Sequence, residues 1–63
     1  MKAGDKVKQK GVPGTKVYRI CSMDANTTML GKWSRCVIYA IERTSTFFVM
    51  GYDEFIEKFE LCN

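Results

Sequence analysis

Several short segments of this chain alternate between apolar and polar residues with period two, and this pattern constrains the fold more than any other feature. Period two places successive side chains on opposite faces of an extended backbone, so each segment predicts a β-strand. Many of their residues are β-branched or aromatic, which favours strands further. Alternation is clearest over 5–10, whereas residue type predicts a strand over 15–22; further strands are predicted over 29–41 and over 46–50, which Gly51 closes. Both faces are apolar around 37–39, so the third strand is expected to be the most covered.

Turns are expected between these strands. Pro13 and Gly14 suit a type II turn over 11–14, because glycine accepts the positive φ that the third position of this turn requires. A polar connection is expected over 24–28 and a further turn over 42–45.

The segment 53–59 has helical periodicity. Phe55 and Phe59 are four residues apart with Ile56 beside them, which gives a short helical turn one apolar face. Two acidic residues at its start suit the helix dipole. The alternation over 59–62 then predicts a final short strand.

A chain of 63 residues has room for one domain, which we place at 1–63. Four to five short strands joined by tight turns predict an all-β fold, and closing so small a sheet into a barrel removes its exposed edges. We therefore expect a small SH3-like barrel of antiparallel strands with one short helical turn near the C-terminus. In this architecture the last strand lies beside the first.

Two stretches of the sequence resemble small bacterial domains. The opening is similar to that of YodC-like SH3-like barrels in Lys2-Ala3-Gly4-Asp5-Lys6-Val7, Pro13, Val17 and Ile20. The chain also resembles a short bacterial family of unknown function, in the stretches Val37-Ile38-Tyr39, Phe48-Val49-Met50 and Glu54-Phe55-Ile56-Glu57. The resemblance implies an SH3-like fold in a bacterial or phage protein, and it implies no catalytic residues.

Composition excludes several kinds of chemistry. The chain has no histidine, which excludes Ser-His and Cys-His catalysis and histidine metal sites. Cys21, Cys36 and Cys62 form no closely spaced pair of the kind that binds zinc. We interpret them as small apolar side chains in a reducing compartment, with a Cys21–Cys36 disulfide as the alternative. No catalytic residue, metal or cofactor is predicted.

The expected location is the cytoplasm. The chain has no apolar run long enough to span a bilayer, and its first residues lack the apolar stretch of a signal peptide. No membrane contact is predicted. The acidic residues of 53–60 are interpreted as a helix start and a solvated face, because no glycine-rich loop frames them as a cation site.

Charge is unevenly distributed along the chain. The net charge is +3, with +6 in residues 1–35 and −3 in residues 36–63. A basic face with neighbouring aromatic rings can bind nucleic acid, the cations on phosphates and the rings on bases. Alternatively, the basic first strand lies beside the acidic end of the chain and pairs with it. The candidate binding residues are Lys6, Lys8, Lys10, Lys16, Tyr18, Arg19, Trp33 and Arg35.

The chain has eight aromatic residues, more than a small core requires. We assign Phe48, Phe55 and Phe59 to the core. The other candidates either form a binding groove or a cage for a cation, or they cap the barrel. These are Tyr18, Trp33, Phe47 and Tyr52.

Two functions from different classes follow. The first is a non-enzymatic binding or adaptor module that acts through protein–protein contact at an aromatic groove or a strand edge. Its partner is a second copy of the chain or another protein, as for a phage-type inhibitor of a host enzyme. The alternative is a nucleic-acid-binding small barrel that uses the lysine-rich strand face and Trp33. An accessory domain with no partner of its own stays open as a third interpretation.

Overall fold

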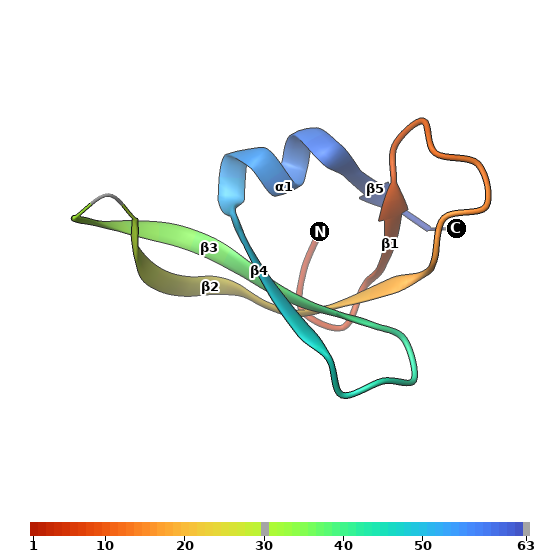
Figure 1. Cartoon of the computed structure of the whole chain (residues 1–63), viewed down its shortest axis with the longest axis horizontal. Helices are drawn as coiled ribbons and strands as arrows, with labels where there is room; N and C mark the ends of the chain where they lie inside the picture. The colour runs from red at the N-terminus through yellow and green to blue at the C-terminus, as the bar shows by residue number, and fades with distance from the viewer. Residues whose placement is uncertain (30, 63) are drawn as a thin grey trace.

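The computed structural model describes residues 1–29 and 31–62, which form a mostly β domain (Figure 1). Its elements are β1 (Lys6–Gln9), β2 (Tyr18–Met29), β3 (Lys32–Ile41), β4 (Phe47–Gly51), α1 (Tyr52–Lys58) and β5 (Phe59–Leu61). The strands pair antiparallel in the order β4-β3-β2-β1-β5. Four to five antiparallel strands were expected and the sheet has five; the C-terminal helical turn and the return of the last strand beside the first are confirmed.

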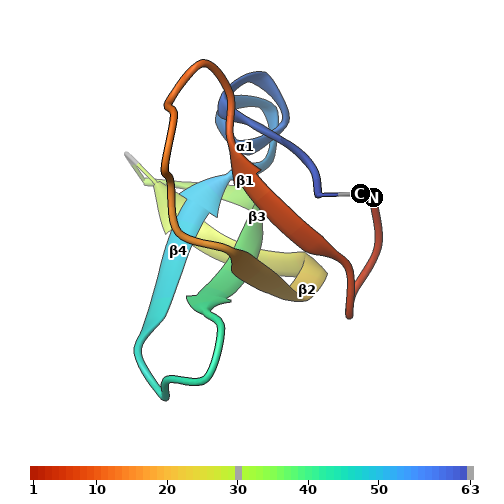
Figure 2. The ribbon, with the colours of Figure 1, turned by 90° about the vertical axis from the view of Figure 1, so that its right-hand side faces the viewer.

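The sheet is open, which corrects the expectation of a closed barrel. Within residues 1–29 and 31–62, β4 and β5 are the two edges and do not pair with each other. They are connected by α1, which lies over the curved sheet (Figures 1 and 2). Phe55, at the centre of this helix, is fully buried. The helix therefore covers the side of the core where a barrel would have a strand pair.

β2 is longer than the sequence predicts, because 24–28 continues the strand instead of forming a polar connection. Register shifts between Ile20 and Ser22 and between Ser22 and Ala25 insert extra residues into β2 opposite β3. Bulges of this kind bend a strand and increase its twist. The start of β2 pairs with β1, whereas its second half runs with β3 away from α1 (Figure 1). Polar residues suit a strand that is solvated in this way, so its composition resembles that of a loop.

An aromatic cluster lies at the centre of the core. The core residues are Val7, Ile20, Met23, Val37, Tyr39, Phe55 and Phe59. The rings of Phe55 and Phe59 are stacked with centroids 4.5 Å apart, and the Tyr39 centroid is 5.2 Å from each. The assignment of these two phenylalanines to the core is confirmed. Phe48 stacks on Tyr39 but is 37% exposed, because it stands on the edge strand β4.

The cysteines are free in the structure: Cys36 is buried, and Cys21 and Cys62 are half-buried. Among residues 1–29 and 31–62, no group of three or more acidic or cysteine side chains could hold a metal ion. No helix in the same residues has the length and apolar character needed to cross a membrane.

Because Tyr39 is buried, we expect the free energy of unfolding to change with pH in the alkaline range. Desolvation raises the pKa of its phenol above the usual value of 10.0, and the charges of Tyr18 and Glu54 act in the same direction. The unfolded chain therefore ionises this phenol more readily than the folded chain does. We expect this contribution to leave the free energy of unfolding unchanged below about pH 10 and to lower it as pH rises toward the folded-state pKa.

The measurement is urea unfolding at neutral and at alkaline pH for the wild type and for Tyr39→Phe, which keeps the ring. The variant should lose less stability across the alkaline range. An identical loss in both proteins would contradict the assignment to Tyr39, because lysine deprotonation acts on both equally.

Candidate functional site

The alternation of side chains along the strands places Lys6 and Lys8 of β1 on the face of the sheet opposite to Trp33 of β3. Val7 is buried in the core, so its neighbours Lys6 and Lys8 on β1 face away from the core. On β3, Trp33 is four residues before the buried core residue Val37, so the two side chains lie on the same face of the strand. The lysines of β1 and the tryptophan that was predicted to stack on bases therefore do not form one binding surface.

Contacts within the domain engage most of the predicted basic side chains. The Nζ of Lys6 lies 3.2 Å from Glu42 Oε1, and the Nζ of Lys8 lies 4.0 Å from Glu60 Oε1. Lys10 Nζ donates a hydrogen bond to the Ile56 carbonyl near the end of α1. Because β1 pairs with β5, the alternative that the basic first strand pairs with the acidic end of the chain is confirmed. Such exposed pairs stabilise the fold little, but they reduce the positive charge offered to a polyanion.

Three further candidates, Lys16, Tyr18 and Arg19, differ in their surroundings. Lys16 and Arg19 are exposed, and neither has an ion-pair partner among the described residues. Tyr18 is half-buried and packs edge-on against Tyr39 and Phe59, with centroid distances of 5.6 and 5.5 Å. Its ring packs against the core cluster and is not a free stacking surface.

Trp33 lies on the part of the β2–β3 hairpin that extends beyond α1, which we call the hairpin arm (residues 25–29 and 32–35; Figure 1). It pairs across the hairpin with Thr28 and is 78% exposed. This is the highest exposure among the large apolar side chains whose burial the structure describes. Tryptophan is usually well buried, so an indole held in solvent by a paired strand is the most unusual feature of this surface.

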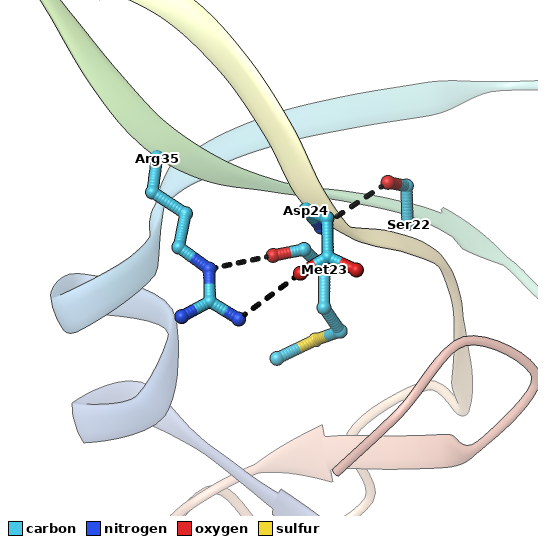
Figure 3. Close-up of polar contacts among 4 residues, drawn as sticks. All are labelled: Ser22, Met23, Asp24 and Arg35. Carbon is cyan, nitrogen blue, oxygen red and sulfur yellow. Dashed lines mark hydrogen bonds and ion pairs between the residues drawn. The ribbon is translucent and has the colours of Figure 1, made fainter.

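Arg35 holds the hairpin arm against the rest of the domain (Figure 3). Its Nε–H donates to the Met23 carbonyl at 2.9 Å, and its Nη2 donates to Asp24 Oδ1 at 3.3 Å. Met23 lies in the bulged part of β2, where a backbone carbonyl can lose its partner in the strand ladder. The guanidinium also lies 3.9 Å from the ring centroid of Tyr52, the first residue of α1. Arg35 was predicted to bind a ligand, and in the structure its polar atoms contact the domain itself.

A hollow of about 520 Å³ lies beside these residues. It is lined by Ser34, Arg35, Gly51, Tyr52, Asp53 and Glu54. Trp33 is two residues from Arg35 on the same face of β3, which places their Cα atoms about 7 Å apart. Glu54 pairs with Lys58 at 3.2 Å, whereas Asp53 has no ion-pair partner in the described part of the chain. The hairpin arm and the start of α1 thus form an indole surface next to a polar depression.

A second apolar surface lies on β4, and sequence reasoning identified it only in part. Phe47 and Val49 are 60% and 57% exposed. Phe47 was named as a candidate aromatic residue, but Val49 was not. The signal that could have identified both is the absence of any charged residue over 44–52, which is unusual for an exposed strand.

Comparison with protein family models, with curated proteins and with solved structures found no match to this chain. The resemblance to YodC-like domains therefore stays a hypothesis, and the functional argument depends on the geometry above.

Proposed function

We propose that this domain is a non-enzymatic binding module that recognises a protein partner through Trp33 and the hairpin arm. The observation that carries the proposal is the 78% exposure of Trp33. A domain of this size depends strongly on aromatic area for its core, so leaving its one tryptophan in solvent forgoes stability. Tryptophan is also the residue type most enriched among those that dominate binding energy at protein interfaces.

The surroundings of Trp33 support this proposal because strand pairing holds its backbone in place. The hairpin arm is paired along its length, from Ala25 opposite Cys36 to Met29 opposite Lys32. Arg35 connects the arm to the bulge of β2 and to α1. A surface that is rigid before binding loses less conformational entropy when the partner arrives. The adjacent hollow gives a partner side chain room beside the indole.

The architecture favours an SH3-like relationship. The order β4-β3-β2-β1-β5, the bent second strand and the helical turn before the last strand are typical of that class. SH3-like domains that bind peptides present aromatic rings in a shallow groove. We place this domain in a bacterial or phage cytoplasm as part of the same proposal.

Nucleic-acid binding is the less favoured function. It requires a path of unpaired cations with stacking rings beside it. Lys6 and Lys8 are paired with carboxylates, and Trp33 is on the other face of the sheet. Of the predicted cations, Lys10, Lys16 and Arg19 have no ion pair within residues 1–29 and 31–62, and Lys10 donates a hydrogen bond to the Ile56 carbonyl.

The test compares the immobilised wild-type domain with Trp33→Ala for retention of proteins from extracts, followed by titration of each retained protein in purified form. We expect Trp33→Ala to weaken binding about 30-fold, which corresponds to about 2 kcal/mol. Val12→Ala, at an exposed apolar residue of the β1–β2 loop, is the control and should bind as the wild type does. Raising the salt concentration should change the affinity little.

The wild-type domain and its variants are also titrated with single- and double-stranded oligonucleotides at two salt concentrations. Oligonucleotide binding that falls steeply with salt and is abolished by Lys6→Glu with Lys8→Glu would support the alternative function. Equal binding of a purified partner by the wild type and by Trp33→Ala would contradict the proposal.

A further inference from the structure

We propose that the free edge of β4 pairs antiparallel with β4 of a second copy of this chain, forming a two-fold dimer with one sheet continuous across both copies. This proposal concerns a different surface from Trp33 and does not depend on the proposed function.

β4 has a free edge of backbone groups. It bonds to β3 on one side, from Phe47 opposite Ala40 to Gly51 opposite Cys36. On its other side no strand of residues 1–29 and 31–62 pairs with it. In an antiparallel ladder, alternate residues direct their N–H and C=O groups to opposite sides. Part of the polar backbone of β4 therefore points outward, where the described residues supply no partner strand.

The two edges of the sheet differ in how they are protected. β5 has three residues and carries Glu60, which is paired with Lys8. Short length and charge are the features that keep a sheet edge from pairing with another chain. β4 has five residues, Phe47-Phe48-Val49-Met50-Gly51, with no charge and no proline. Of the two edge strands, β4 is therefore better suited than β5 to accept another strand.

The side chains of β4 favour an apolar neighbour. Phe47 and Val49 share the face that points away from the core, and both are more than half exposed. With the two-fold axis near Val49, the centre of the strand, the two Val49 side chains would face each other across the new pair. Directly opposed apolar side chains on neighbouring strands are the contacts that stabilise a sheet.

Charge around β4 favours a second copy of this chain as the occupant. Before the strand, Glu42 is paired with Lys6, which leaves Arg43 as the cation of that end. After the strand, Glu54 is paired with Lys58, which leaves Asp53 as the anion. In an antiparallel pair the two copies of β4 run in opposite directions. The end of one strand that carries Arg43 therefore lies beside the end of the other that carries Asp53. A strand pair of this length buries less than about 1,200 Å², so we expect micromolar affinity.

The experiment measures the mass of the full chain in solution by sedimentation equilibrium from micromolar to millimolar concentration. The wild type should change from monomer to dimer. Val49→Lys places a charge at the centre of the edge and should raise the dimer dissociation constant about tenfold or more. Val12→Lys makes the same change at an exposed valine of the β1–β2 loop and should dimerise as the wild type does. Far-ultraviolet circular dichroism confirms that both variants are folded.

Amide hydrogen exchange gives a second measurement. The amides of 47–51 should become more protected as concentration rises in the wild type, and they should not in Val49→Lys. A wild type that stays monomeric at millimolar concentration would overturn the proposal, as would a dimer that Val49→Lys leaves intact. A dimer that Trp33→Ala removes and Val49→Lys retains would assign self-association to the hairpin arm instead.

Discussion

Replacing Phe55 with alanine is expected to leave most of the chain unfolded at 25 °C. Phe55 is fully buried, and its ring stacks on Phe59 with centroids 4.5 Å apart and lies 5.2 Å from Tyr39. Truncating a buried phenylalanine costs about 3–5 kcal/mol. The single core of a domain this small supplies roughly the same free energy in total. The loss of one ring is therefore comparable with the stability of the whole domain.

Urea unfolding followed by far-ultraviolet circular dichroism checks this expectation. Fluorescence is less suitable, because the exposed Trp33 senses solvent in the folded state as well. Ile56→Ala is the matched control on the same helix: its side chain is 37% exposed, and the change should cost less than about 1 kcal/mol. Similar midpoints for the two variants would contradict the view that α1 covers the core through Phe55.

Ending the chain at Lys58 is expected to abolish cooperative folding. This removes Phe59, which is 1% exposed, together with the β5 pairing of Gln9, Lys8 and Val7. β1 would become an edge strand of four residues that keeps its pairing to β2 alone. The core would lose an aromatic ring and the strand that holds β1 in place at the same time, so the cost should exceed that of Phe55→Ala.

An NMR spectrum of the backbone amides of the shortened chain measures this effect, because the amide proton resonances of an unfolded chain are poorly dispersed. A chain ending at Leu61 is the control. It keeps β5 and loses the hydrogen bond from the Cys62 N–H to the Lys6 carbonyl, so it should fold with a small loss of stability. A well-dispersed spectrum for the chain ending at Lys58 would show that β5 is dispensable.

Local patterns were sufficient to predict the type of each element. Alternation identified β1 to within one residue at each end, because one face of this strand differs from the other. The run of aromatic and apolar residues closed by Gly51 identified β4 equally well. The spacing of Phe55 and Phe59 identified α1, since residues four apart share a helix face. The second half of β2 was missed because its strand is solvated, and solvated strands lack apolar alternation.

The candidate site was predicted in its residues but not in its arrangement. Trp33 and Arg35 were named from the sequence, and they lie together on the hairpin arm. Lys6 and Lys8, which were named with them, are on the opposite face and pair with Glu42 and Glu60, and Lys10 donates to the Ile56 carbonyl. Charge counts along a chain cannot show which carboxylates lie opposite which lysines, because those pairs form between distant segments.

The sequence by itself determined that this chain makes short strands, one short helix and an aromatic core, because periodicity and side-chain type act over a few residues. Tertiary structure alone decided that the sheet stays open, that β4 is an unpaired edge and that Trp33 is exposed. Each of these depends on which strands become neighbours and how the bulges bend β2, and both arise from contacts between residues far apart in the chain.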